Sequence, residues 1–436
     1  MSVPFDRAVV ARVAAAQRFD VRHGSIREMS RFVDDLEREL GTHFVRMEFG
    51  IPGLPLDPLA IAAEAEALGA RGRGHVYAPF DGIPELKAEA ARFVQLFLDV
   101  DVTPACCIPT VGSMQGCFVA LALAGQLRAE RRTVVLLEPG FPVNRLQLRL
   151  LGLRAEPLDF YDHRGPRLLE AVERLAARGD VCALLWSSPN NPSWICLQPA
   201  ELEGLARIAE RYELIAIEDL AYFGMDTRQD YYQPGRPPFQ PSVLQHGSRA
   251  ISLISTSKLF SYAGQRIGLA VIAPALMDAQ APALVERFGT ANIGHAFVHG
   301  GLYPLTACVP QSSQHGLLAL LRAANGGERR LFGAAAEYAR RARIVKRLFL
   351  DHGFRLVYDN DLGAPLADGF YFTVAHPAYA HGADLLAELL HYGISAITLE
   401  TAGSIRVEGL RACVSQTGDA EFPLLEERLG RFSRGT

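Results

Sequence analysis

The chain has 436 residues, of which 49% are hydrophobic and 21% are charged, a balance typical of a folded protein that excludes extensive disorder. A formal net charge of −4 favours no polyanionic partner, and no basic cluster is interleaved with aromatic residues, so no nucleic-acid partner is expected. A chain of this length is expected to form two or three packing units.

The seven cysteines indicate a reducing compartment. Only Cys106 and Cys107 are adjacent, and neither a disulfide framework nor a CxxC metal site can be drawn. The N-terminal stretch lacks a signal-type apolar core, and no later run reaches membrane-spanning length. We therefore expect a cytoplasmic protein with no membrane partner and no bound metal.

Three regions are expected along the chain. Residues 1–75 are predicted to be mostly helical, with a proline-rich break, "GIPGLPLDP", and to pack with a small domain or a partner subunit. Residues 76–325 alternate apolar strands, polar loops and amphipathic helices, which predicts an α/β domain whose mostly parallel central sheet has helices on both faces. Residues 326–436 contain a long helical stretch, "RRLFGAAAEYARRARIVKRLFL", followed by short strands such as "GFYFTVA" and "LRACVS", and predict a smaller α+β domain.

The strands of the large domain end in polar residues. They are expected at "TVVLLEP" near residue 133, "VCALLWSSP" near 181, "ELIAIEDLA" near 213, "AISLISTSK" near 250 and "IGLAVIA" near 267. In open α/β sheets ligands bind beyond the carboxyl ends of the strands. The functional site is therefore expected at these polar endings.

Lys258 and Asp219 are expected at the ends of two of these strands. An amine held in a pocket can form a Schiff base with a carbonyl compound, and a carboxylate can keep a pyridine nitrogen protonated. Taken singly, a surface lysine and a helix-capping aspartate are the better interpretations of these two residues.

Two loops provide further candidate ligands. In "SSPNNPSW" the turn before Pro192 presents Asn190 and Asn191, although an ordinary Asn-Pro turn has the same sequence. In "PTVGSMQGCFVALAL" the residues Gly112, Ser113 and Met114 begin an apolar helix, whose free amides favour a phosphate.

Together these pieces resemble the fold-type I enzymes that depend on pyridoxal 5′-phosphate (PLP), and in particular the class I/II aminotransferase family. The resemblance covers nearly the whole chain and rests on six ordered pieces: "VYAPFDGIPELKAEAARF", "PTVGSMQG", "EPGFPVNRLQL", "SSPNNP", "IEDLAYF" and "STSKLFSYAGQRIG". It implies an enzyme with PLP as cofactor and an amino acid as substrate.

The resemblance also implies roles for single residues. Lys258 would form the Schiff base with PLP and move a proton, and Asp219 would hold the protonated ring nitrogen. Asn191 and Tyr222 would hydrogen-bond the ring hydroxyl O3′, and Phe141 would stack on the ring.

The implied phosphate ligands are Gly112, Ser113, Met114, Ser255, Ser257 and Arg266. Tyr77 matches a family tyrosine that reaches the phosphate of the neighbouring subunit, which implies a homodimer with shared active sites.

Three segments depart from the family pattern. Ser193 and Trp194 replace the usual Thr-Gly pair, and the indole either reshapes the substrate side of the site or packs under the loop. Alignment of "GLRACVS" selects Arg411 for the substrate carboxylate, with Arg406 as the alternative. The third segment, residues 294–316, is rich in His, Gly and Pro, and His295 and His299 are either ligands or, more commonly, solvated or structural histidines.

The expected function is that of a PLP-dependent aminotransferase. The alternative keeps the same cofactor residues and eliminates or replaces a β- or γ-substituent, as in relatives that act on S-adenosylmethionine. A PLP-binding regulator is disfavoured because no DNA-binding module precedes residue 76. Nicotinamide and P-loop enzymes are disfavoured because GxGxxG after the first strand and GxxxxGK[ST] are absent.

Overall fold

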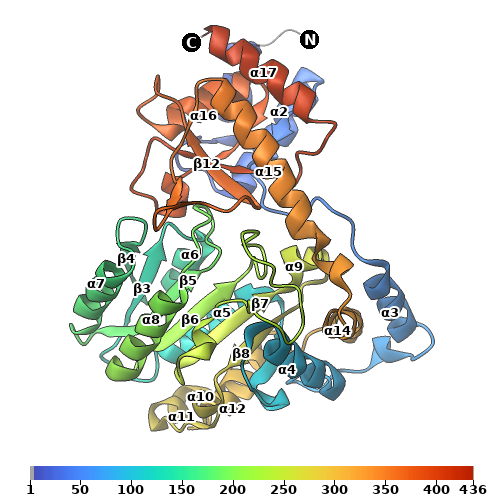
Figure 1. Ribbon diagram of the computed structural model, residues 1–436, viewed down its shortest axis with the longest axis vertical. Helices are drawn as coiled ribbons and strands as arrows, with labels where there is room; N and C mark the ends of the chain where they lie inside the picture. Colours follow the sequence, from blue (N-terminus) through green and yellow to red (C-terminus); the bar gives the residue numbers. More distant parts are fainter. Residues whose placement is uncertain (1–3, 436) are drawn as a thin grey trace.

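The computed structural model describes residues 4–435, which form a larger and a smaller unit (Figure 1). Within these residues the larger unit contains a seven-stranded sheet with strand order β2-β8-β7-β6-β5-β3-β4. The strands are β2 (Cys107–Thr110), β3 (Thr133–Glu138), β4 (Arg154–Asp159), β5 (Val181–Ser187), β6 (Ile215–Leu220), β7 (Ala250–Ser255) and β8 (Gly268–Ile272). β8 runs antiparallel to β2 and β7, whereas β7, β6, β5, β3 and β4 are paired in parallel.

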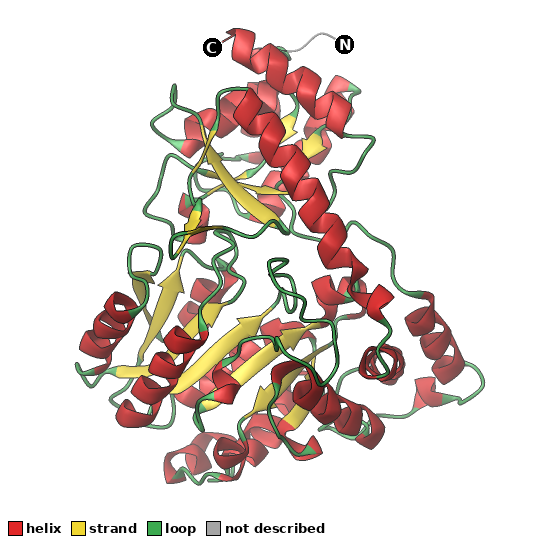
Figure 2. Ribbon diagram, in the orientation of Figure 1, coloured by secondary structure: helices red, strands yellow, loops and turns green. Residues whose placement is uncertain are grey.

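Helices cover both faces of this sheet (Figure 2). In Figure 1 the strands lie in front of α5 and behind α8. The helices of this unit include α4 (Pro84–Leu98), α5 (Gly112–Ala124), α6 (Val143–Leu150), α7 (Pro166–Ala176), α8 (Pro199–Tyr212) and α14 (Gln311–Asn325). All residues of β5 and β7 are buried, as expected of strands packed on both sides.

The smaller unit is built on an antiparallel sheet with strand order β14-β15-β12-β9. Its elements include α15 (Gly333–Asp351), β9 (Arg355–Leu356), β12 (Tyr371–Ala375), α16 (Gly382–His391), β14 (Ile397–Thr398), β15 (Leu410–Cys413) and α17 (Phe422–Gly435). The fold class expected from the sequence, a mostly parallel α/β sheet with an additional smaller unit, is confirmed.

The N-terminal region divides between the two units. α1 (Arg7–Gln17) and α2 (Ile26–Leu40) contribute to the apolar core of the smaller unit, and β1 (Val45–Arg46) pairs in parallel with β13 (Ile394–Ser395). α3 (Pro58–Leu68) instead packs on α14 of the larger unit.

The segment before α14 is helical. It consists of α12 (Ile293–His295), the π-helix η6 (Ala296–Leu302) and α13 (Tyr303–Thr306). His295 and His299 are exposed on it, and their ring centroids are 4.3 Å apart. Within residues 4–435, no helix has the length and apolar character needed to cross a membrane.

Candidate active site

The carboxyl ends of β5, β6 and β7 bring the candidate residues together. The pairing of the strands places Ser187 beside Asp219, and Asp219 beside Leu253. Ser187 is followed by the loop with Asn190 and Asn191. The side-chain Nδ2 of Asn190 and the backbone nitrogen of Asn191 each lie 3.4 Å from the Ser187 hydroxyl oxygen. Segments far apart in the sequence thus meet at one edge of the sheet.

Lys258 lies in the short helix α9 (Thr256–Leu259), which follows β7 directly and is capped by Ser255. Its Nζ atom is 5.7 Å from the centre of the Tyr222 ring. Burial lowers the pKa of the Lys258 amine, although the negative charge of Asp219 opposes this effect. The amine is therefore more readily deprotonated than a lysine in water.

Asp219 has an unsatisfied oxygen. Its Oδ1 is buried and has no hydrogen-bond partner among the described residues. Burial raises its pKa to about 6, and the charge of Lys258 counteracts part of that rise. A cavity of about 20 Å³ beside it is lined by Phe141, Trp186 and Ser187, among others. A buried carboxylate oxygen without a donor fits a protonated pyridine nitrogen, so this part of the site fits PLP.

The start of α5 and the loop after α9 lie against each other. Gly112 has φ +69°, and a Cβ placed on it would come within 2.6 Å of Nη2 of Arg266. A Cβ on Gly268 would lie 3.1 Å from the backbone nitrogen of Ser113. Arg266 is itself exposed, and Ser255 and Ser257 are buried. A helix N-terminus beside a guanidinium and hydroxyl groups has the chemistry that a phosphate requires.

Tyr222 and Asn191 link this region to the smaller unit. The Tyr222 hydroxyl donates to the Tyr371 hydroxyl over 3.0 Å, and Nη1 of Arg411 lies 3.4 Å from Oδ1 of Asn191. Arg411 is 2% exposed, stacks on the Tyr371 ring at 4.6 Å and donates to the Glu48 carbonyl. Its Nε atom is buried without a hydrogen-bond partner in the described part of the chain, so one donor is free for a ligand.

Arg406 lies in a different environment. It forms ion pairs with Asp159 at 3.1 Å and Asp162 at 2.6 Å, and its guanidinium stacks on the rings of Tyr161 and Tyr358. The Arg406 guanidinium is therefore already bound to side chains of both units.

Two further candidates, Tyr77 and Met114, have exposed side chains. Tyr77 is 82% exposed and lines a separate pocket of about 480 Å³ with Arg73 and Gln311. Met114 presents its side chain to solvent, while its carbonyl accepts a hydrogen bond from Gln147 over 2.9 Å.

Tyr371 was missed in the sequence analysis. It sits on β12, 149 positions from its partner Tyr222, and a contact at that separation leaves no periodic or local signal. Trp194, for which two interpretations were open, is 1% exposed and packs against Tyr222 and Tyr371. The indole therefore lies under the loop and directly behind the tyrosine pair.

An amine of lowered pKa and a carboxylate whose Oδ1 has no hydrogen-bond partner among residues 4–435 lie at the carboxyl edge of a mostly parallel sheet, and these are groups that covalent carbonyl chemistry requires. The family model "Aminotransferase class I and II" matches residues 47–296, more than half of the chain, and the chain belongs to this family.

The relatives are distant. The chain is 28% identical over 217 residues to the glutamate-pyruvate aminotransferase AlaC of Escherichia coli, a match that covers 48% of each chain. It is 25% identical over 233 residues to a probable aspartate aminotransferase of Methanocaldococcus jannaschii, covering 53% of this chain and 58% of the relative. The matched segment thus spans about half the length of these curated relatives.

The fold extends further than these sequence matches. The aspartate aminotransferase from Thermus thermophilus with maleate superposes with a TM-score of 0.75, covering 98% of this chain and 99% of that chain at 22% identity. At this identity the comparison shows the fold.

Proposed function

We propose that the protein is a PLP-dependent aminotransferase that moves an amino group from an amino acid to a keto acid. The observation that carries the proposal is the buried Oδ1 of Asp219, which has no partner in residues 4–435 and lies in the field of the Lys258 amine. Family membership supports the same cofactor.

PLP would supply an aldehyde for the amine and a ring that takes up electrons when its nitrogen is protonated. Asp219, with a pKa of about 6, is mostly ionised at neutral pH, and its negative charge would keep the proton on the ring nitrogen. Lys258, whose pKa is lowered by burial, would hold the cofactor through its neutral amine and would afterwards carry a proton to and from the substrate Cα. The phosphate would be held by Arg266, Ser255, Ser257 and the start of α5.

We assign the α-carboxylate of the substrate to Arg411. Its stacking on Tyr371 and its free Nε support this choice, whereas the two ion pairs of Arg406 disfavour the alternative. A guanidinium with a free donor binds a carboxylate through charge-assisted hydrogen bonds.

We also propose that residues 1–75 form an N-terminal segment that packs with the small domain or a partner subunit, except for α3, which packs on α14, and that 76–325 and 326–436 are the large and small domains. The two apolar cores support a division close to this one, because Phe332 belongs to the core of the larger unit and Ala335 to that of the smaller unit. The seven free thiols of the described chain support a reducing, cytoplasmic location.

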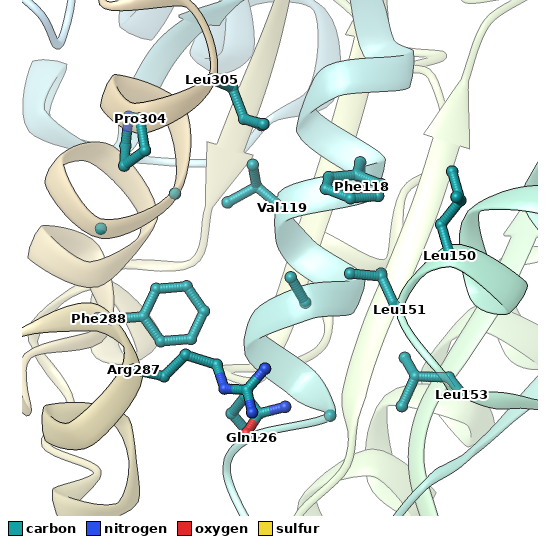
Figure 3. A pocket seen from close by; sticks show the side chains of 14 residues that line it. Phe118, Val119, Gln126, Leu150, Leu151, Leu153, Arg287, Phe288, Pro304 and Leu305 are labelled. Carbon is teal, nitrogen blue, oxygen red and sulfur yellow. The ribbon is translucent and has the colours of Figure 1, made fainter.

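A homodimer with shared sites is proposed from the exposed apolar surface. Figure 3 shows a pocket on the outer side of α5, about 290 Å³ in volume, with Phe118, Leu150 and Leu305 around it. Leu150 is 80% exposed, and Met114 and Leu146 extend the patch along α5 and α6. Apolar patches of this kind mark subunit interfaces. The family resemblance assigns Tyr77 to the phosphate of the second copy.

Sedimentation velocity tests the assembly. The wild type is expected to sediment as a dimer, and Leu150→Arg is expected to weaken the dimer because it places a charge in the apolar patch. A wild-type protein that stays monomeric at micromolar concentration contradicts the assembly.

The cofactor and the reaction are tested by borohydride reduction and peptide mapping. The purified protein is expected to show a visible band that borohydride bleaches, with the cofactor trapped on Lys258 and not in Lys258→Ala. Asp219→Ala is expected to keep some cofactor and lose most turnover. A band that persists in Lys258→Ala overturns the proposed lysine.

A panel of amino acids, including S-adenosylmethionine, then separates the reactions. Conversion of the cofactor to its amino form with release of a keto acid supports transamination. Release of a leaving group without that conversion supports elimination or replacement and contradicts the proposed reaction.

A further inference from the structure

Trp194 has a backbone conformation that is unfavourable for a residue with a bulky side chain. Its φ is +65°, in the left-handed region that a bulky L-residue rarely adopts. The resemblance places a glycine at this position, which would adopt that conformation without strain. A strained residue that persists at a site suggests that its side chain has a role there.

The indole contacts the tyrosine pair edge to face. Its ring centroid lies 5.1 Å from that of Tyr222 at 60°, and 6.1 Å from that of Tyr371 at 71°. On another side it touches Gly369, where an added Cβ would come within 2.1 Å of Cε2 of the indole. The absence of a side chain at Gly369 thus makes room for the indole, and the packed indole limits the positions open to the Tyr222 ring.

The indole nitrogen adds a second unusual feature. Nε1 of Trp194 is buried and lacks a hydrogen-bond partner in the described residues. A cavity of about 60 Å³, large enough for a water molecule, is lined by Trp194, Tyr371 and Tyr358 among others. The indole is therefore held by shape and not by a hydrogen bond to the protein.

We propose that Trp194 is a positioning residue that fixes the Tyr222 hydroxyl and, through it, sets the proton affinity of the C=N bond between Lys258 and the cofactor. The inference rests on the proposed function. A hydroxyl that donates to O3′ draws negative charge away from the neighbouring nitrogen and lowers its pKa. A tyrosine hydroxyl has one proton, so with O3′ in place the Tyr222 hydroxyl would donate to O3′ and accept from the Tyr371 hydroxyl 3.0 Å away, the reverse of the direction described above.

The test is a pH titration of the visible band of the holoenzyme. Trp194→Gly relieves the backbone strain but removes the ring, and the midpoint is expected to rise by about one pH unit. Trp194→Phe keeps part of the packing and is expected to shift the midpoint less. Phe97→Leu, a truncation in the core of the large unit beside Phe93 and Phe332, is the matched control and should leave the midpoint unchanged.

A double variant shows whether the effect passes through Tyr222. In the Tyr222→Phe background the hydroxyl is gone, so adding Trp194→Gly or Trp194→Phe should shift the midpoint no further. Equal midpoints in the wild type and both single variants overturn the inference, as does a full additional shift in the double variants. A wild type whose band is not trapped on Lys258 would instead overturn the proposed function.

Discussion

Glu218 and Asp219 are adjacent on β6, and successive side chains of a strand face opposite sides of the sheet. Glu218 is fully buried and accepts hydrogen bonds from the hydroxyls of Ser242 at 2.6 Å and Ser252 at 2.9 Å. Its Oε1 has no partner in the described chain, and burial raises its pKa to about 7. The two acidic side chains thus lie on opposite faces of the sheet, and of the two Asp219 faces the site.

The raised pKa of Glu218 makes the stability pH-dependent. Below its ordinary pKa of 4.5 the carboxyl is protonated in both the folded and the unfolded state. As the pH rises to about 7 the unfolded chain releases this proton first, so the free energy of unfolding falls by roughly 3 kcal/mol. Glu218→Gln has no proton to lose. Its free energy of unfolding, relative to the wild type, is expected to increase by roughly 3 kcal/mol between pH 4 and pH 8, measured by urea denaturation.

The exposed Glu203 of α8 provides the control for this comparison. Glu203→Gln is expected to differ from the wild type by less than about 0.5 kcal/mol at both pH values. A difference between Glu218→Gln and the wild type that is the same at both pH values would show that this carboxyl does not titrate in the window.

Two arginines of the smaller unit can be told apart by kinetics. Arg411→Lys removes the bidentate geometry that binds a carboxylate, and KM for the amino acid is expected to rise about 100-fold with the cofactor band retained. Arg406→Lys disturbs the contacts with Asp159 and Asp162, so it is expected to lower the melting temperature while KM changes less than about threefold. The reverse pattern would assign the carboxylate to Arg406.

At the scale of elements, the buried strands could be predicted from the sequence and the others could not. β3, β5, β6, β7 and β8 coincide with apolar runs because their residues are buried almost throughout. β4 lies at the edge of the sheet, and its partly exposed "RAEPLD" shows no such run. β2 is a four-residue strand with a proline, too short for a clear pattern.

The site shows the same contrast. Lys258 and Asp219 are recognisable because Lys258 comes just after the apolar strand β7 and Asp219 lies at the end of the apolar strand β6, and the parallel pairing then brings the strand ends together. The segment with His295 and His299 was too rich in Gly and Pro to predict the α- and π-helical turns that it forms. Tyr371 joins Tyr222 from the other unit, and which side chains meet between two units depends on packing that no local pattern encodes.

At the scale of the whole molecule, a hairpin of the smaller unit joins the two units. β10 (Asn360–Asp361) and β11 (Ala364–Pro365) pair as antiparallel strands. Asp361, 3% exposed, forms ion pairs with Arg164 at 2.6 Å and Arg228 at 2.8 Å, and both arginines belong to the larger unit. The buried carboxylate is thus satisfied only when the units are in contact.

Asp361→Asn therefore tests how strongly this contact supports the fold. Removing one partner of a buried ion pair costs about 3–5 kcal/mol, but Arg164 keeps Glu201 and Arg228 keeps Asp226, so a loss of about 2 kcal/mol is expected. Asp359→Asn is the control. Asp359 is exposed and its carboxylate accepts a hydrogen bond from the Tyr161 hydroxyl, so the loss should stay below about 1 kcal/mol. Urea unfolding gives both values. Equal losses of unfolding free energy in the two variants would contradict this expectation. Exposed Asp359 would then contribute as much as buried Asp361, and the charge of Asp361 would not be needed to hold the units together.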